Sequence, residues 1–203
     1  MIEVLSNIWG AIIGASWYEQ LATILGLVGV GLTIRQSIWN FPVGLVQVSL
    51  SAVVFYQARL YADMKLQGFF FVVLAYGWWH WARPGDNRTV LPVTRLSLAG
   101  RVGCIAAGLA GAGLWGWYLY ANTDAAMPFR DAFIASLSIL AQWLQARKKL
   151  ENWTGWMMVN LAAIVVYWMA GLYWFSVLYL LFFVLALGGH FEWLKSFRQH
   201  ART

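Results

Sequence analysis

Seven long apolar runs that carry almost no charge constrain this chain more than any other feature. They lie at 20–34, 41–60, 66–82, 97–121, 130–146, 153–169 and 171–190. A helix needs roughly 20 mostly apolar residues to cross the hydrocarbon core of a bilayer. The composition of the whole chain also indicates a membrane protein, because 61% of all residues are hydrophobic and only 11% are charged. The sequence therefore predicts an all-α integral membrane protein with seven transmembrane helices.

The basic residues predict how these helices are oriented. If the N-terminus lies outside, eleven of the fourteen Lys and Arg residues fall in cytoplasmic loops or the C-terminal tail, and only Arg59, Lys65 and Arg130 fall outside. Cytoplasmic loops of membrane proteins carry an excess of Lys and Arg. The predicted orientation is N-out/C-in. It accounts for the net charge of +6, so no nucleic-acid partner is expected.

An internal repeat appears when the sequence is displaced by 112 residues. Positions 58–81 then align without a gap over 170–193, and nine of the 24 pairs are identical. Matched pairs at this offset include Gly77/Gly189, Trp81/Trp193, Arg35/Arg147 and Asn40/Asn152. Apolar bias alone would not readily match Arg, Asn, Gly and Trp at one offset. The pattern predicts two copies of a three-helix unit.

The span at 97–121 joins the two copies. Three spans are an odd number, so two directly fused copies would have opposite orientations, whereas one additional span restores the orientation of the second copy. We therefore expect a 3+1+3 arrangement of parallel repeats. The Gly and Ala residues of this span indicate close packing rather than a site. The predicted organisation is an N-terminal interfacial segment at 1–18, the first repeat at 19–82, a cytoplasmic loop and linker helix at 83–125, the second repeat at 126–195 and a basic cytoplasmic tail at 196–203.

Charged and reactive side chains are confined to span ends and loops. All eight acidic residues lie there, whereas ion-coupled transporters usually keep an ionisable residue within the membrane. The sequence therefore favours facilitated diffusion, and it has no P-loop for ATP. Cys104 is single, and His80 and His190 have no metal-ligand partner at helical spacing. We expect no metal, no cofactor and no enzymatic constellation.

Uncharged polar residues within the spans are the candidates for solute binding. Gln47, Gln142 and Asn160 stand out, because an amide in hydrocarbon needs a hydrogen-bond partner or a wet cavity. Gln47 and Asn160 are 113 residues apart, which predicts nearly equal depth in the second helix of each copy. The amides would then face one another across the pseudo-axis. The alternative is interhelical hydrogen bonds that only stabilise the bundle, typically by about 0.6 kcal/mol each.

Two tryptophan motifs suggest a site for a flat ring. Trp39 adjoins Asn40, and Trp153, Trp156 and Asn160 share one helix face through the spacing i, i+3 and i+7. Indoles on such a face can stack on a planar heteroaromatic ring while the amide binds its edge. A cationic ring would also gain cation–π attraction. The alternative for any single tryptophan is packing, or anchoring at the membrane interface.

The sequence resembles the Pnu-type (PnuC-like) vitamin transporters over nearly its whole length from about residue 20. The motifs that carry the resemblance are Ser37-Ile38-Trp39-Asn40-Phe41-Pro42-Val43-Gly44, Leu60-Tyr61-Ala62-Asp63, Tyr76-Gly77-Trp78, and Gln142-Trp143-Leu144-x-x-Arg147-Lys148-Lys149-x-Glu151-Asn152-Trp153-x-x-Trp156. The family implies a fold similar to SWEET sugar transporters, facilitated diffusion, and trapping of the product by a cytoplasmic kinase.

The resemblance also implies a vitamin as substrate and a bacterial inner-membrane location. Nicotinamide riboside is the expected solute; thiamine or riboflavin, and less readily a SWEET-type sugar, remain alternatives. The implied substrate-binding residues are Trp39, Asn40, Gln47, Trp153, Trp156 and Asn160, and Gln142 is added from its mid-span position. Because the Trp153–Trp156 face belongs to the second copy, recognition is expected to depend mainly on that half. The oligomeric state is left open, and a homo-oligomer is allowed.

Overall fold

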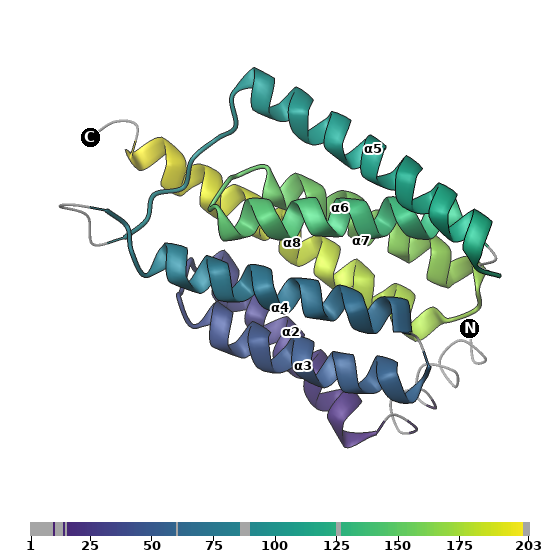
Figure 1. The fold of residues 1–203 in the computed structure, drawn as a ribbon. Helices are drawn as coiled ribbons and strands as arrows, with labels where there is room; N and C mark the ends of the chain where they lie inside the picture. The colour runs from purple at the N-terminus through teal and green to yellow at the C-terminus, as the bar shows by residue number, and fades with distance from the viewer. Residues whose placement is uncertain are drawn as a thin grey trace.

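The computed structural model describes residues 10, 14, 16–59, 61–85, 90–124 and 127–200. Within these ranges the chain forms seven named helices, one for each predicted run, and a single isolated β-bridge between Thr94 and Lys149 (Figure 1). The helices are α2 (Trp17–Ile34), α3 (Asn40–Gln57), α4 (Tyr61–Trp81), α5 (Leu98–Asn122), α6 (Pro128–Ala146), α7 (Asn152–Met169) and α8 (Tyr173–His200). The predicted interfacial segment at 1–18 lies largely outside the described residues.

Length and composition alone make α2, α5 and α8 long and apolar enough to cross a membrane. The other four helices contain the polar side chains that the sequence singled out. Gln47 lies in α3, Gln142 in α6 and Asn160 in α7, while α4 begins with Asp63 and Lys65 in its first two turns. Polar residues inside a span lower its mean hydropathy. Three of these four helices therefore carry an amide that was predicted to bind a solute.

The ends of the helices follow local capping rules. Ser16 and Glu19 form a reciprocal capping box at the start of α2, and Pro128 occupies the first turn of α6, where its missing N–H costs nothing. The helices α2 and α6 both end in a Schellman turn. Its left-handed residue is Gln36 (φ 55°) in the first case and Lys148 (φ 53°) in the second, so two turns of the same form lie 112 residues apart.

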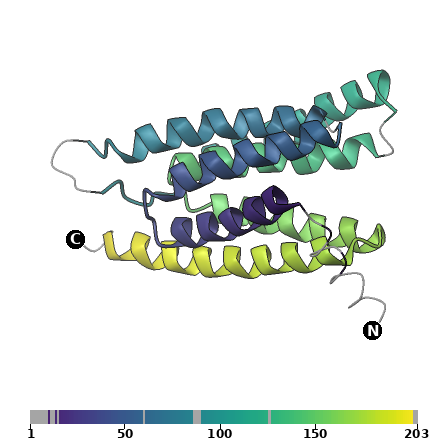
Figure 2. The ribbon, with the colours of Figure 1, turned by 90° about the horizontal axis from the view of Figure 1, so that it is seen from below.

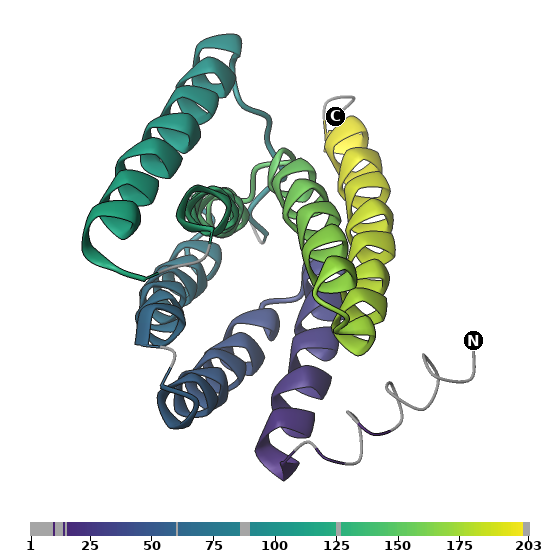
Figure 3. The same ribbon diagram turned by 90° about the vertical axis from the view of Figure 1, so that its right-hand side faces the viewer.

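Six helices pack in a closed ring. Contacts run from α2 to α3, α4, α6, α7 and α8 in that order, and α8 returns to α2, whereas α5 packs on α6 outside the ring (Figures 2 and 3). The helices α3 and α7 therefore lie on opposite sides of the ring. This places the second helix of each three-helix group across from the other, with the first and third helices at the junctions between the groups.

The ring is filled at one end by an aromatic core. Phe41 meets Trp81 edge-on at a centroid distance of 5.0 Å, and Trp153 meets Trp193 in the same way at 5.5 Å. The two indoles on α4 and α8 also bridge the junctions. Trp81 Nε1 donates to the Ala146 carbonyl (3.1 Å) on α6, and Trp193 Nε1 donates to the Thr33 carbonyl (3.0 Å) on α2. Each three-helix group is thus bonded to the other through a buried indole.

Two glycines allow this core to close. A Cβ on Gly77 would lie 2.5 Å from the Phe41 ring, and a Cβ on Gly189 would lie 2.4 Å from the Trp153 ring. Real Cβ atoms do not approach carbon that closely. Glycine is therefore required at both positions because an aromatic side chain rests directly on the helix backbone.

We expect Gly189→Ala to destabilise the protein by about 1–3 kcal/mol, since the new methyl group overpacks the Trp153 indole. Gly188→Ala is the matched control: its Cβ would meet nothing within 4 Å, and alanine is the better helix former. Unfolding of the detergent-solubilised variants by thermal denaturation measures the difference. Equal midpoints for the two variants would contradict the close packing described here.

Candidate functional site

Buried polar side chains line the contact between α6 and α7. Gln142 and Gln145 lie on one face of α6, separated by three residues, and only 7% and 9% of their surfaces are exposed. Trp156 on α7 donates its indole N–H to Gln145 Oε1 at 3.1 Å. The helices approach closely beside this bond, because Gly155 leaves room for the Ala141 side chain. This hydrogen bond fixes the orientation of the Trp156 indole.

Two amides lie about one helical turn beyond the Trp156–Gln145 bond, on the side that is farther from the α6–α7 turn. Because α6 and α7 are antiparallel, Gln142 on one helix and Asn160 on the other are both displaced in that direction, by about 4.5–6 Å along the helix axes. Gln142 Nε2 is buried without a hydrogen-bond partner. Asn160 is 6% exposed, and none of the side-chain hydrogen bonds of the described residues involves its amide. We call Gln142, Gln145, Trp156 and Asn160 the polar strip.

Unpartnered amides of this kind are costly. Leaving a buried donor or acceptor without a partner costs about 1–3 kcal/mol. A bound solute or an ordered water that supplies the missing partners removes this cost. The polar strip therefore has the chemistry of a binding site: one oriented indole face and two amides with free hydrogen-bonding capacity.

Trp153 occupies a different environment from Trp156. Its indole is 2% exposed and rests on Gly189 in the aromatic core, edge-on to Trp193. Its Nε1 is buried without a partner. In this conformation the ring faces are occupied by protein. Its predicted role in binding a solute stays a prediction.

The predicted site residues on α3 do not form a cluster like the polar strip. Trp39 is 67% exposed at the start of α3. Asn40 closes the turn before α3 by donating from Nδ2 to the Ser37 carbonyl (2.6 Å), as Asn152 does to the Lys149 carbonyl (2.7 Å). Both asparagines keep a buried Oδ1 without a partner.

Gln47 is half-buried on α3 and donates to Ser51 Oγ at 3.0 Å. Its helix lies across the ring from α7, which carries Asn160. Of the predicted site residues, Gln142, Trp156 and Asn160 are thus brought together. Trp39, Asn40 and Gln47 belong to another part of the bundle. Gln145 was missed by the sequence reasoning; its i, i+3 spacing from Gln142 was the available signal.

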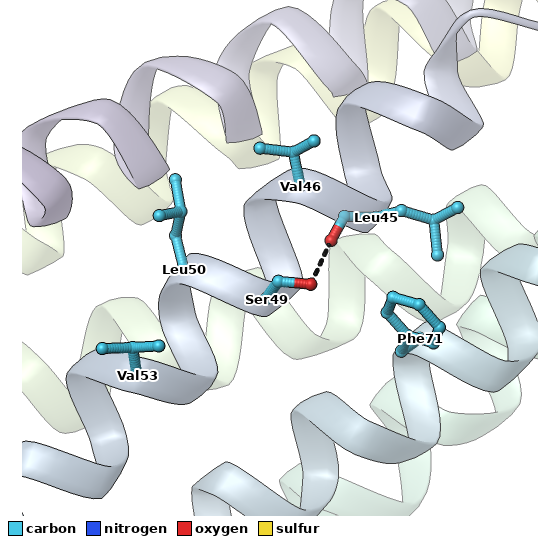
Figure 4. A pocket seen from close by; sticks show the side chains of 6 residues that line it. All are labelled: Leu45, Val46, Ser49, Leu50, Val53 and Phe71. Atoms are coloured by element: carbon cyan, nitrogen blue, oxygen red, sulfur yellow. Dashed lines mark hydrogen bonds between the residues drawn. The ribbon is translucent and has the colours of Figure 1, made fainter.

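A hollow on the outer surface of α3 and α4 does not coincide with these residues. It is lined by Leu45, Val46, Ser49, Leu50, Val53 and Phe71 (Figure 4). Its single hydroxyl, on Ser49, is already bonded to the Leu45 carbonyl at 2.8 Å. The lining is otherwise apolar, which suits contact with lipid chains better than recognition of a polar solute.

Lys148 is a second residue whose setting the sequence did not reveal. It was counted with the loop cations, yet it is 1% exposed in the α6–α7 turn. Its Nζ donates to the Leu91 carbonyl (2.6 Å) and lies 4.5 Å from the Trp81 ring centroid. The segment before α5 is also paired with this turn, through backbone bonds of Thr94. Burial lowers the pKa of Lys148 from its ordinary value of 10.5 to about 8.

This pKa predicts a stability that depends on pH. Between pH 8 and 10.5 the unfolded chain binds more protons at Lys148 than the folded protein does, so stability due to this group rises with pH across that window. Relative to Lys148→Met, the wild type should gain up to about 3 kcal/mol between pH 7.5 and pH 10.5. Unfolding midpoints of both proteins across this range test it. A constant difference would show that Lys148 is not desolvated in the folded state.

The arrangement belongs to a recognisable class. The whole fold matches the crystal structure of the vitamin B3 transporter PnuC, with a TM-score of 0.76 and 23% identity over 98% of this chain and 92% of that one. This fold, with its long apolar helices, defines an all-α multi-pass membrane protein.

The family follows from the sequence itself. Residues 16–195 match the model of the nicotinamide mononucleotide transporter family, and the chain belongs to that family. It is 31% identical to the nicotinamide riboside transporter PnuC of Escherichia coli (strain K12), over 91% of this chain and 87% of the relative. It is 29% identical to the riboflavin/roseoflavin transporter RibM of Streptomyces davaonensis, over 92% and 88%. The Pnu-type resemblance is confirmed, and the protein is a transporter rather than an enzyme.

Proposed function

We propose that this protein mediates facilitated diffusion of nicotinamide riboside, an NAD precursor, across the bacterial inner membrane. The observation that carries the proposal is the buried, unpartnered Nε2 of Gln142 beside the oriented Trp156 indole, with the amide of the buried residue Asn160 at the same level of the bundle. Relatives named as nicotinamide riboside transporters support the choice of solute. A cytoplasmic kinase would trap the product and so maintain the inward gradient.

The chemistry of the solute fits the polar strip. Its pyridinium ring is flat and cationic, and it would stack on the Trp156 face with cation–π attraction. The carboxamide and ribose hydroxyls would pair with the amides of Gln142 and Asn160. Trp39, Asn40, Gln47 and Trp153 complete the proposed set of substrate-binding residues, the first three from the opposite side of the ring. Movement of the two copies against each other would bring these two groups of residues to the solute in turn.

We also propose the 3+1+3 organisation of parallel repeats with an N-out/C-in orientation. The bounds of α3 (40–57) and α7 (152–169) differ by 112 at both ends, and the Schellman turns before them differ by the same number. These equivalences and the distribution of basic residues support it. The proposed units are an interfacial segment at 1–18, repeats at 19–82 and 126–195, a loop and linker helix at 83–125, and a cytoplasmic tail at 196–203.

A second candidate solute is riboflavin, which the relative RibM favours. Riboflavin and thiamine are also planar heteroaromatics, but uncharged riboflavin would gain nothing from cation–π attraction. Binding of cationic nicotinamide riboside should therefore depend more strongly on the electron-rich face of Trp156 than binding of riboflavin does.

Proteoliposomes containing the protein should equilibrate labelled nicotinamide riboside down its gradient without any proton or sodium gradient, because no coupling residue lies in the proposed site. The measurement is uptake with and without ionophores, and with unlabelled thiamine or riboflavin as competitors. Uptake that collapses on dissipating an ion gradient would exclude facilitated diffusion. Stronger competition by riboflavin than by nicotinamide riboside itself would assign the alternative solute.

Gln142→Ala and Asn160→Ala should each weaken solute binding about tenfold, the loss expected for one hydrogen bond. Asn122→Ala is the matched control, since that exposed amide at the end of α5 bonds only to the Tyr118 carbonyl. Gln47→Ala tests the opposite side of the ring. Binding is measured by calorimetry on purified protein. Unchanged affinity with reduced thermal stability would show that these amides only stabilise the bundle.

A further inference from the structure

A groove separates α5 from α6 at the end of the bundle that carries the α6–α7 turn. Its volume is about 350 Å³, and its walls include Gly103 and Ala107 of α5 with Leu140 and Leu144 of α6. Arg147 and Lys149 lie at its mouth. The groove is therefore apolar along its length and cationic at one end.

Uneven packing of the two helices creates this shape. A Cβ on Gly116 would lie 2.4 Å from the Phe129 ring, and one on Gly108 would lie 2.9 Å from Leu140, so the helices are in close contact from the middle of α5 toward its C-terminal end. A Cβ on Gly103 would meet nothing within 4 Å. In Figure 1 the two ribbons accordingly converge near the C-terminal end of α5 and diverge toward its start. We call this space the α5–α6 groove.

The cations at the mouth form no salt bridge with any described residue of the chain. The described residues contain two ion pairs, Arg101 with Glu151 and Arg130 with Asp131, and neither involves Arg147 or Lys149. Arg147 is exposed, with its guanidinium carbon 5.7 Å from the Trp143 ring centroid. Both cations follow the end of α6, at the level where lipid headgroups meet a membrane-spanning helix. An anionic group is the partner that this charge requires.

We propose that the α5–α6 groove binds one anionic diacyl phospholipid. The phosphate is held by Arg147 and Lys149, since Arg and Lys are the usual side chains for phosphate. An acyl chain fills the space beside Gly103 and Ala107, which protein side chains leave open. The two features are needed together: the cations alone would attract any anion, but only a lipid also has a chain to cover the apolar walls. The inference does not depend on which solute is carried.

The first copy offers a built-in comparison. Arg35 ends α2 as Arg147 ends α6, and both are exposed residues preceding a left-handed turn residue. However, among the named helices of the described residues none packs on α2 in the way that α5 packs on α6, and Lys149 is replaced by Ser37 at the same offset. Arg35 therefore has the charge of Arg147 without a second cation or a described helix that would form the other wall of a groove.

Native mass spectrometry of the full-length protein in mild detergent tests the proposal, with phosphatidylglycerol and phosphatidylcholine of identical chains as probes. The wild type should retain one phosphatidylglycerol in preference to phosphatidylcholine. The double variant Arg147→Gln/Lys149→Gln should lose this preference by about thirtyfold, at about fivefold for each basic side chain. Arg35→Gln should leave it unchanged. Equal retention of both lipids by the wild type, or an unaltered preference in the double variant, would overturn the proposal.

A second pair of variants tests the groove separately from its charge. Gly103→Leu places a side chain in the groove at a position where a Cβ meets nothing within 4 Å, and it should reduce retention of both lipids. Gly113→Leu, whose Cβ also meets nothing but which does not line the groove, should not. Equal unfolding temperatures and monodisperse elution confirm that both variants fold. Unchanged lipid retention in Gly103→Leu contradicts the site. Loss of an oligomer instead of a lipid would show that a second copy of the chain covers the groove.

Discussion

Two indole hydrogen bonds between helices of different groups hold this bundle together. In hydrocarbon, helices gain little from hydrophobic attraction to one another, so packing and hydrogen bonds determine how they associate. The carbonyls of Thr33 and Ala146 lie in the last turn of their helices, where the backbone leaves acceptors available. Trp81 and Trp193 use them from the third helix of the opposite group. These two contacts close the ring at both junctions, and the same indoles form the aromatic core with Phe41 and Trp153, whose rings rest on Gly77 and Gly189.

The similarity of the two halves ends where the candidate site begins. At the offset of 112, Gln142 corresponds to Val30, Gln145 to Thr33 and Trp156 to Gly44. The polar strip between α6 and α7 therefore has no counterpart between α2 and α3. Phe41 and Trp153 occupy equivalent places in the core, but only the indole adds an N–H without a partner. The architecture is shared by both halves, while the buried hydrogen-bonding capacity is concentrated in the second.

The linker helix α5 has a different relation to the bundle from the other six helices. Among the described residues it packs mainly on α6, through glycines that bring the two helices together from the middle of α5 toward its C-terminal end. Elsewhere its surface is exposed, including Leu98, Val102 and Ile105. In a bilayer these exposed apolar side chains are available for contact with lipid chains. A helix that looked inert in the sequence thus forms one wall of a groove.

The sequence by itself determined the helices, because hydropathy and charge act locally. All seven predicted runs became helices, and the buried amides Gln142 and Asn160 were recognised from their cost in hydrocarbon. The family was also evident from motifs. Only the tertiary structure decided which groups are in contact. Gln145 orients Trp156, and Trp153 is packed in the core. Lys148 is buried between the Leu91 carbonyl and the Trp81 indole. Those contacts join α6 to α7 or a turn to the distant Leu91 segment, and no local pattern encodes the register in which two helices pack.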